Sequence, residues 1–560
     1  MQIESKRYFN FQNIKKDTIL FRHYQINVAN SCKSKNSLAI LPTGLGKTII
    51  GILLIAYSLK KYPKSSVVIL APTRPLVIQH KTSCKKFLDI DPNEIISLTG
   101  KVSPEKRISL FNNSKVILST PQIINNDLIR GRYSLKKVSL IIFDEAHKTK
   151  GNYSYNTISK EYIKMCKDPL ILGLTASPGK DYERIQEICN NLFIENIVFK
   201  SYEDDDVKDY IYDIDTFINL IILPIKIMEI SQVWYHLFTG FLKFFIDRNL
   251  INPFKKYYSK LDFLRITHDL TLSFRFEEGY ISEEEYFDNL IFQDPKILDT
   301  VKENDIDIHS IFSYCSTCIS ILHAKDLIET QDISLFISFL ERIKYKAEQG
   351  ALSAKRIVNS KQFSFVNSVI EKEKLSDSTH PKIDKIFSII HEEVEEFNNK
   401  KIIIFTHFRE MAEFLKKKLQ DKFQNELIIE KFIGQTSKID DTGFSQKMQR
   451  EILDRFRKEE INILIATCVA EEGIDIPNVD SIIFYEPVPS EIRLIQRRGR
   501  TGRYAPGRCY ILVTEDTVDI PFYHVARRKE NSMKLVLTGY ENGQFVGEAT
   551  FVNQAVKSVK

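Results

Sequence analysis

The sequence has no apolar stretch long enough to cross a membrane, since none reaches about 18 uncharged residues. Its first residues, MQIESKRYFNF, lack the pattern of a secretory signal peptide. Both absences favour a cytoplasmic location. The net charge of +6 is small for 560 residues. It permits a nucleic-acid partner without requiring one, because a basic groove can lie in a near-neutral protein.

Cysteine is also scarce, with 8 residues scattered along the chain, as expected in a reducing compartment. Only Cys315 and Cys318 form a C-x-x-C pair, and no second pair completes a tetrahedral zinc site. Their flanks, IFSYCSTCISIL, are apolar. We therefore predict that both are core cysteines.

A chain of 560 residues corresponds to about three or four domains. Two stretches alternate short apolar strands with helical segments, which predicts two doubly wound parallel sheets. Between them, residues 215–375 show long amphipathic helical patterns. This middle segment has 19 Lys+Arg against 23 Asp+Glu, so we do not expect a generally basic clamp. The expected strands are Ser37–Leu41, Ser66–Leu70, Ile95–Leu98, Val116–Leu118, Val138–Phe143 and Ile171–Leu174 in the first stretch, and Ile402–Phe405, Lys431–Ile433, Ile461–Ile465, Ser481–Phe484 and Cys509–Val513 in the second.

The segment LPTGLGKT (Leu41–Thr48) lies between two apolar runs, the strand–loop–helix context of a phosphate-binding loop. Its two glycines allow a tight turn whose N–H groups can point at phosphate oxygens. Lys47 supplies a positive charge for the β- and γ-phosphates, and Thr48 offers a hydroxyl to Mg²⁺. The strict pattern has glycine where Leu41 stands, so the match is imperfect.

An acidic pair, Asp144 and Glu145, follows the predicted strand Val138–Phe143. An aspartate at a strand end beside a phosphate loop can hold Mg²⁺, and a neighbouring glutamate can orient and deprotonate the attacking water. The second strand series has no phosphate loop of its own. It carries instead the arginine cluster QRRGRTGR (Gln496–Arg503), which is suited to stabilising charge from a second lobe.

These motifs, taken together, resemble those of superfamily 2 helicases. The set comprises Tyr24-Gln25, LPTGLGKT, APTRP, TPQ, DEAH, TAS and QRRGRTGR, in order over about residues 1–205 and 380–530. Three longer segments resemble the archaeal Hef helicases and their eukaryotic FANCM relatives. They are Phe432–Leu453, Asp144–Tyr155 and Tyr485–Arg503.

The resemblance implies an α/β fold of two RecA-like parallel-sheet lobes with an all-α insert between them. We expect lobe one in residues 1–205, the insert in 206–378, lobe two in 379–535 and a C-terminal tail in 536–560. The family uses its insert to engage forked or branched DNA. Many archaeal Hef proteins continue into a nuclease, whose motif is absent from this sequence, so we expect a helicase-only version or the partner of a separate nuclease.

The resemblance also implies roles for individual residues. The expected ATP contacts are Arg22, Tyr24, Gln25, Leu41, Pro42, Thr43, Gly44, Leu45, Gly46, Lys47, Thr48, Gly473 and Asp475. The expected Mg²⁺ ligands are Thr48 and Asp144. The expected catalytic residues are Glu145 as base, Gln496 near the γ-phosphate, and Arg500 and Arg503 as arginine fingers. The residues expected to couple ATP to nucleic acid are His147, Thr175 and Ser177. The expected nucleic-acid contacts are Thr73, Arg74, Gly100, Thr120, Gln122, Thr406, Arg409, Gly434, Gln435 and Thr467.

The sequence thus predicts an ATP-dependent helicase or translocase of forked or branched DNA in replication-fork repair and recombination. Hydroxyl, amide and guanidinium contacts to phosphates position a strand without reading its sequence, so we expect largely sequence-independent binding. Two alternatives stay open at this point. One is an RNA-directed ATPase like Dicer or the innate RNA sensors. The other is an ATP-switched scaffold that recruits a nuclease or a sliding clamp.

Overall fold

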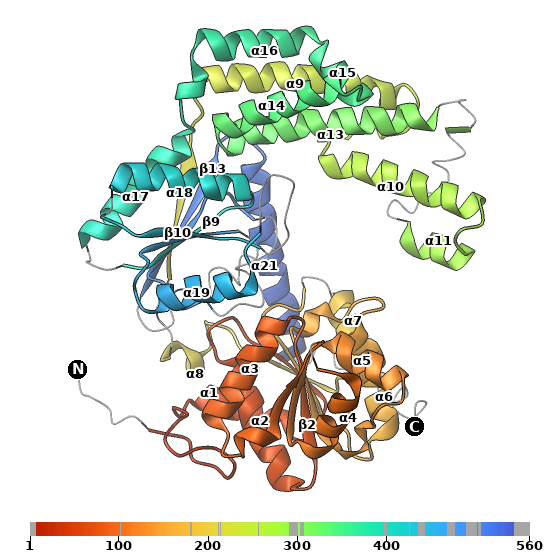
Figure 1. Cartoon of the computed structure of the whole chain (residues 1–560), viewed down its shortest axis with the longest axis vertical. Helices are drawn as coiled ribbons and strands as arrows, with labels where there is room; N and C mark the ends of the chain where they lie inside the picture. The colour runs from red at the N-terminus through yellow and green to blue at the C-terminus, as the bar shows by residue number, and fades with distance from the viewer. Residues whose placement is uncertain are drawn as a thin grey trace.

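The computed structural model describes residues 7–100, 102–179, 182–210, 212, 214–255, 257–290, 301–302, 307–396, 400–424, 426–434, 443–467, 476–488, 501 and 506–541. It has two α/β lobes and a group of helices beyond the second lobe (Figure 1). The order along the long axis is lobe one, lobe two and the helical insert. No helix in these ranges is both long and apolar enough to cross a membrane.

Lobe one is built on a parallel sheet of seven strands in the order β3-β4-β2-β5-β6-β1-β7. Its central strands are buried along their whole length because helices cover both faces, as β-branched runs in parallel sheets require. The strands are β1 (Ser37–Ile40), β2 (Ser66–Leu70), β3 (Ile95–Leu98), β4 (Val116–Ser119), β5 (Val138–Asp144), β6 (Ile171–Thr175) and β7 (Asn196–Phe199). The helices are α1 (His23–Cys32), α2 (Lys47–Lys61), α3 (Arg74–Phe87), α4 (Pro104–Asn113), α5 (Pro121–Ile129), α6 (Ser154–Met165), α7 (Tyr182–Leu192) and the short α8 (Asp205–Lys208).

Lobe two is built on a parallel sheet of six strands in the order β10-β11-β9-β12-β13-β8. The strands are β8 (Ile214–Ile221), β9 (Ile402–Phe405), β10 (Ile429–Phe432), β11 (Ile463–Ala466), β12 (Ser481–Phe484) and β13 (Gly507–Thr514). The described helices are α17 (Pro381–Glu396), α18 (Arg409–Phe423), α19 (Gln446–Arg457) and α21 (Asp519–Glu541). The predicted strands in both lobes agree with these bounds to within a few residues. Among the described strands, β7 and β8, each at the edge of its sheet, were not predicted.

The insert is all-helical within its described residues. Its helices are α9 (Ile225–Ile246), α10 (Lys260–Glu277), α11 (Glu283–Asn289), α13 (Ile308–Thr330), α14 (Ile333–Glu348), α15 (Leu352–Val358) and α16 (Lys361–Lys372). Trp234, fully buried on α9, packs against Phe336 and donates its indole N–H to the Ile321 carbonyl oxygen at 2.8 Å. Both aromatic side chains thus lie in the core of the insert. Cys315 and Cys318 are also buried in this core, and burial raises the pKa of the Cys315 thiol to about 12.

The insert and lobe two share one hydrophobic core. The same cluster of buried side chains includes Trp234 and Phe336 from the insert and Ile402 and Ile404 from β9. The opposite face of the second sheet has a separate core, which contains Ile403. The insert is therefore seated on one face of lobe two.

Two elements bear on the expected domain limits. The expected helical insert domain, residues 206–378, includes β8 (Ile214–Ile221), which pairs along its whole length with β13. A strand with this partner packs as part of the second sheet, so we propose that the insert begins after Ile221. The other element is α21, which continues from lobe two through residues 536–541 of the expected tail, residues 536–560.

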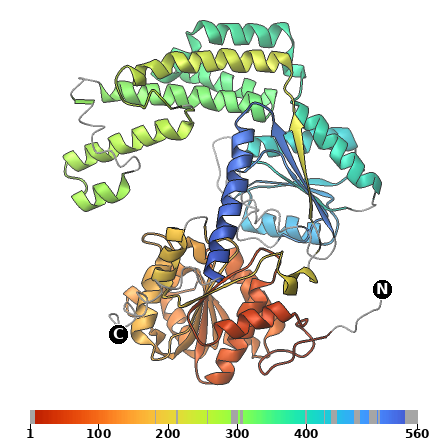
Figure 2. The ribbon, with the colours of Figure 1, turned by 180° about the vertical axis from the view of Figure 1, so that it is seen from behind.

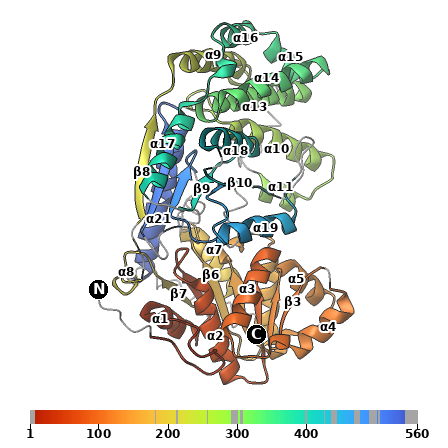
Figure 3. The same cartoon turned by 60° about the vertical axis from the view of Figure 1, so that its left-hand side comes forward.

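Helix α21 connects the two lobes. It begins at lobe two, where Ala526 is buried in the core of the second sheet. Farther along, Met533 is buried in the core of lobe one. Figure 2 shows α21 in dark blue, passing from one lobe to the other, and Figure 3 shows the same helix in a side view.

Candidate functional site

The phosphate loop connects β1 to α2 at the carboxyl end of the first sheet. Gly44 and Gly46 have φ angles of 92° and 79°, a left-handed conformation that glycine adopts without strain. A Cβ on Gly46 would lie 2.4 Å from the Gln25 Nε2 atom, so the end of the Gln25 side chain would have to move. Lys47 donates from Nζ to the Leu41 carbonyl oxygen at 3.0 Å. Leu41 is fully buried and its N–H donates to the Thr175 carbonyl oxygen. This position therefore anchors the start of the loop to the sheet.

Side chains from α1 hold the same loop from the side. Tyr24 donates its hydroxyl to the Leu45 carbonyl oxygen at 2.9 Å, and Gln25 donates from Nε2 to the same oxygen at 3.1 Å. Both side chains are buried. Arg22 donates to the Tyr24 hydroxyl at 3.3 Å and lies over the Tyr210 ring. In this structure Tyr24 and Gln25 therefore shape the loop, and an adenine contact by Gln25 stays a prediction.

Two tyrosines that follow β7 also reach this region, and the sequence analysis did not identify them. Tyr202 donates its hydroxyl to the Thr43 carbonyl oxygen at 2.6 Å. The Tyr210 ring packs against Tyr24 with 5.7 Å between centroids. Neither has a motif around it, so only the fold reveals their position. Pro42 and Thr48 complete the loop, and Thr48 is the second residue of α2.

Asp144, at the end of β5, is buried and paired with a histidine that the sequence analysis missed. The His80 Nε2 atom on α3 lies 2.7 Å from the Asp144 Oδ2 atom. Burial raises the Asp144 pKa, but the charge and hydrogen bond of His80, together with the charge of Lys47, outweigh it and lower the pKa overall. Burial likewise lowers the His80 pKa, and the carboxylate of Asp144 more than reverses this. Asp144 is therefore held ionised close to the phosphate loop.

Glu145 directly follows, in a left-handed conformation with φ of 50°. Its Oε2 atom lies 3.3 Å from the Nδ1 atom of His147. The same nitrogen lies 3.1 Å from the Thr175 Oγ1 atom, and the Ser177 N–H donates to that oxygen at 3.2 Å. The three residues predicted to couple the sites are thus in contact with one another and with Glu145, and their coupling role stays a prediction.

This row of contacts continues into α21. The Ser177 hydroxyl donates to the Met533 Sδ atom at 3.0 Å, across 356 residues of sequence. Since α21 begins at lobe two, the contact joins the residues around Glu145 to a helix of the other lobe. The sequence contained no signal for it, because Met533 belongs to none of the predicted motifs.

The residues predicted to contact nucleic acid lie at the carboxyl ends of neighbouring strands. In lobe one, Thr73 and Arg74 follow β2, Gly100 follows β3, and Thr120 and Gln122 follow β4. In lobe two, Thr406 and Arg409 follow β9, Gly434 follows β10 and Thr467 follows β11. These are three adjacent strands in each sheet, so each group shares one edge.

The exposure of these residues differs. Gln122 and Thr73 are exposed, and Arg74 has a buried Nε atom without a hydrogen-bond partner. Thr406 and Thr467 are buried, with 0% and 2% of their surface exposed, so neither presents its hydroxyl to solvent in this structure. A nucleic-acid contact by these two threonines therefore needs a local rearrangement.

Six predicted site residues lie outside the described residues. They are Gln435, Gly473, Asp475, Gln496, Arg500 and Arg503. The structure therefore describes the part of the expected ATP site that lobe one contributes. Among the described residues, no group of three His, Cys, Asp or Glu side chains could hold a metal ion by itself.

Comparison with known families gives two matches along the chain. Residues 22–185 match the DEAD/DEAH box helicase family, and residues 382–505 match the helicase conserved C-terminal domain. The first match contains the phosphate loop, Asp144 and Glu145. The second contains the arginine cluster.

Individual proteins are similar over nearly the whole chain. The crystal structure of the Pyrococcus furiosus Hef helicase domain aligns with a TM-score of 0.67 and 37% identity, over 90% of this chain and 98% of that one. A Methanocaldococcus jannaschii protein, provisionally named an ATP-dependent RNA helicase, is 38% identical over 94% of this chain and 61% of its own length. The Schizosaccharomyces pombe ATP-dependent DNA helicase fml1 is 31% identical over 89% of this chain and 57% of its own length. The chain thus spans about six tenths of the length of these two curated relatives.

Proposed function

The chain belongs to the Hef family of DEAD/DEAH-box helicases, which makes it an ATP-hydrolysing enzyme, and we propose that its substrate is forked or branched DNA. One observation supports the motor activity in this proposal. The phosphate loop, Asp144 and Glu145 lie at one edge of the first sheet, and contacts run from Glu145 through Ser177 to a helix of the second lobe. Hydrolysis at one lobe and movement of the other can be linked through such contacts.

The residues around Asp144 fit a magnesium ion. The Asp144 carboxylate and the Thr48 hydroxyl are hard oxygen donors, which Mg²⁺ prefers. A carboxylate that holds a metal is commonly fixed by a further hydrogen bond, and His80 supplies one to Asp144. When bound with ATP, the ion neutralises part of the phosphate charge.

In the proposed reaction, Lys47 and the loop N–H groups hold the phosphates. Glu145 orients a water molecule and accepts its proton, and His147 fixes the position of the Glu145 carboxylate. In the same proposal, Gln496 acts near the γ-phosphate. Arg500 and Arg503 arrive from lobe two as arginine fingers, which contribute on the order of 10³-fold or more in rate. Gly473 and Asp475 border the nucleotide from the same lobe.

The nucleic acid is proposed to cross both sheet edges, contacting phosphates without reading bases. DNA is favoured because fml1, similar over most of this chain, is by name a DNA helicase. The branched substrate, a role in fork repair and recombination, and a separate nuclease or sliding clamp as partner rest on the resemblance to Hef and FANCM. We propose that the protein is located in the cytoplasm, associated with the nucleoid if the source is archaeal.

RNA is the second candidate substrate, because the name of the relative from M. jannaschii describes an RNA helicase. A steady-state ATPase assay separates the two. The protein is mixed in turn with single-stranded DNA, a forked duplex, a four-way junction and double-stranded RNA at equal nucleotide concentration. We expect the largest stimulation with forked or four-way DNA. Stimulation by double-stranded RNA alone would overturn the DNA proposal. If the rate of ATP hydrolysis were the same with and without every nucleic acid, the proposed motor activity would be overturned.

A further inference from the structure

A polar hollow lies where the insert meets lobe two. Its volume is about 630 Å³, within the range of roughly 300–1,000 Å³ that ligand sites occupy. Helices α13, α14 and α15 of the insert form one wall, and the first turn of α18 with the residue before it forms the other. The residues that matter here are His323, Phe339, Arg342, Lys346, Phe408 and Arg409.

The hollow is positively charged. Arg342, Lys346 and Arg409 line it, against one carboxylate among the lining residues, Glu410. His323 adds no charge near neutral pH, because burial, with the positive charges of Lys260 and Arg342, lowers its pKa to about 4. An anionic ligand is therefore favoured.

The hollow also has aromatic walls from both parts of the protein. The His323 ring packs edge-on against Phe339, with 4.8 Å between centroids, and lies 5.9 Å from the Phe408 ring. Phe339 belongs to the insert and Phe408 precedes α18, and both are half-buried. Cations beside aromatic faces are the combination that binds single-stranded nucleic acid, because phosphates meet the cations and bases stack on the rings.

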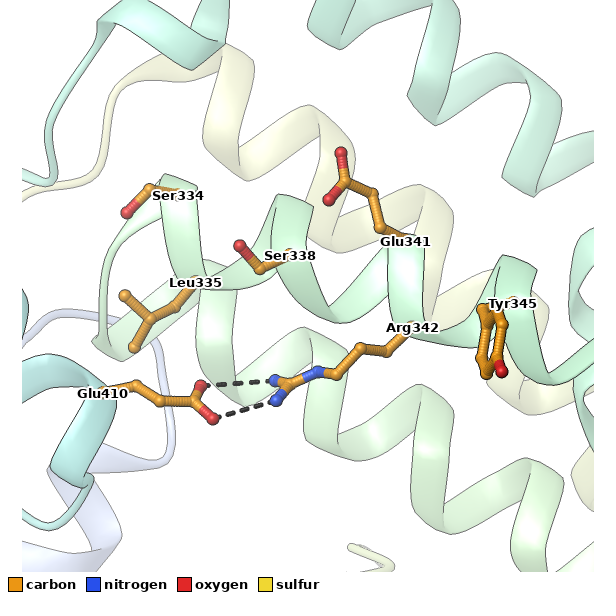
Figure 4. Close-up of a pocket in the computed structure, with 7 residues that line it drawn as sticks. All are labelled: Ser334, Leu335, Ser338, Glu341, Arg342, Tyr345 and Glu410. Carbon is orange, nitrogen blue, oxygen red and sulfur yellow. Dashed lines mark hydrogen bonds and ion pairs between the residues drawn. The ribbon is translucent and has the colours of Figure 1, made fainter. Parts of the chain in front are cut away.

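One ion pair lines both this hollow and a second one. Arg342 donates from Nη1 and Nη2 to the two carboxylate oxygens of Glu410 at 2.9 and 3.3 Å (Figure 4). Both residues also line a hollow of about 500 Å³, which Ser334, Ser338 and Tyr345 border. The pair is half exposed, at 49% and 54%, and exposed pairs contribute little stability, so an entering phosphate can draw Arg342 away from Glu410.

We propose that the groove formed by these two hollows, here called the insert groove, holds a nucleotide of a single-stranded DNA arm. The phosphate contacts Arg342, Lys346 and Arg409, and the base lies against the Phe408 ring. This inference rests on the proposed function, whose nucleic-acid track already includes Arg409. A strand that passes Arg409 at the carboxyl edge of the second sheet can enter the groove directly.

The insert groove would distinguish a fork from a plain duplex. Paired bases are stacked inside a duplex, and extruding one costs unpairing and unstacking energy, whereas an unpaired arm presents its bases freely. The unpaired arm would contact the insert and lobe two at the same point. We therefore expect a duplex that carries an unpaired arm to bind better than a plain duplex.

The test compares two charge reversals on α14. Lys346→Glu changes a residue that lines the groove. Lys344→Glu is the matched control, because Lys344 is also exposed but lies over the Phe363 ring of α16 and lines neither hollow. The affinity of the full chain for a fluorescently labelled fork is measured from 50 to 300 mM salt. We expect Lys346→Glu to weaken binding and to reduce the slope of log affinity against log salt by about 1, as the loss of one phosphate contact does. Lys344→Glu is expected to match the wild type.

The base contact has its own measurement. A fork carrying 2-aminopurine in its unpaired arm changes its fluorescence when that base stacks on a ring, and Phe408→Leu is expected to abolish the change. If Lys346→Glu and Phe408→Leu both match the wild type while DNA still stimulates ATP hydrolysis, the groove proposal is overturned and the proposed function stands. If polyglutamate binds through Lys346 and fork binding does not depend on it, the groove takes acidic peptides and the proposal also fails. If no DNA stimulates ATP hydrolysis in the wild type, the proposed function fails by itself.

Discussion

Lys382 and Asp519 form an ion pair with almost no exposure to solvent. The Lys382 Nζ atom lies 2.7 Å from the Asp519 Oδ2 atom, and the two side chains are 0% and 2% exposed. Lys382 also donates to the Thr330 carbonyl oxygen at 3.0 Å, and Asp519 accepts from the Thr514 N–H at 3.0 Å. These residues stand at the end of α13, the start of α17, the end of β13 and the start of α21. The insert, lobe two and the connecting helix are therefore joined at one buried point.

Replacing Lys382 with methionine is expected to destabilise the protein by about 3–5 kcal/mol, because Asp519 would be left as a buried charge without its partner. Chemical denaturation followed by circular dichroism measures the loss. The double variant Lys382→Met/Asp519→Asn removes both charges and keeps an acceptor for Thr514. It is expected to lose less than the single variant, and a larger loss in the double variant would contradict this account.

His380, two residues before Lys382, is expected to make stability depend on pH. Burial, with the charge of Lys382, lowers its pKa to about 3, against about 6.5 in an unfolded chain. Its neutral ring donates from Nε2 to the Glu329 carbonyl oxygen and accepts the Lys382 N–H at Nδ1. The unfolded chain binds the proton more readily, so this contribution is complete above about pH 6.5 and is lost as pH falls toward about 3.

His380→Asn removes this titration. Between pH 7.5 and 5.5 the wild type is expected to lose about 1 kcal/mol more stability than the variant, measured by urea denaturation at each pH. The comparison cancels the other titrating groups. Equal losses in the two proteins would show that His380 is not held neutral.

Met533→Ala tests the connection made by α21. Met533 is 5% exposed within the core of lobe one, so its truncation is expected to cost about 2 kcal/mol or more in stability. It also removes the contact with Ser177, and we expect DNA to stimulate ATP hydrolysis less in the variant. Leu535→Ala is the control on the same helix, because Leu535 is 74% exposed. An unchanged ratio of stimulated to basal rate in Met533→Ala would exclude α21 from the coupling.

Lys47→Ala is expected to abolish ATP hydrolysis while the protein stays folded. In this structure the Lys47 ammonium group makes a hydrogen bond to the Leu41 carbonyl oxygen, and the lysine of such a loop contacts the β- and γ-phosphates. Phosphate release gives the rate, and circular dichroism gives the fold. Surviving hydrolysis would refute the phosphate-loop assignment.

Arg503→Ala tests the contribution of lobe two to the reaction. The variant is expected to bind ATP as the wild type does and to lose turnover by on the order of 10³-fold, because an arginine finger acts on the transition state. Fluorescent-nucleotide binding and steady-state hydrolysis are measured on the same preparation. A loss of ATP binding instead would place Arg503 in ground-state binding.

Local patterns were sufficient for the strands and the motifs. Buried β-branched runs such as Ser66–Leu70 form strands in any doubly wound sheet, and the turn residues after them carry the chemistry. The phosphate loop was predicted because its glycines act through their own backbone. β8 was missed because its residues are mostly half-exposed or exposed and it follows an acidic segment, so it lacks the buried run that marks a central strand.

The sequence by itself determined which residues have the chemistry for ATP, since Lys47, Asp144 and Glu145 are recognisable from their neighbours in the chain. Only the tertiary structure decided what stands beside them. His80 is 64 residues from Asp144, Met533 is 356 residues from Ser177, and the Arg342–Glu410 pair bridges 68 residues. None of these pairs has a local spacing that a pattern could reveal, because each contact exists only after two separate elements have packed together.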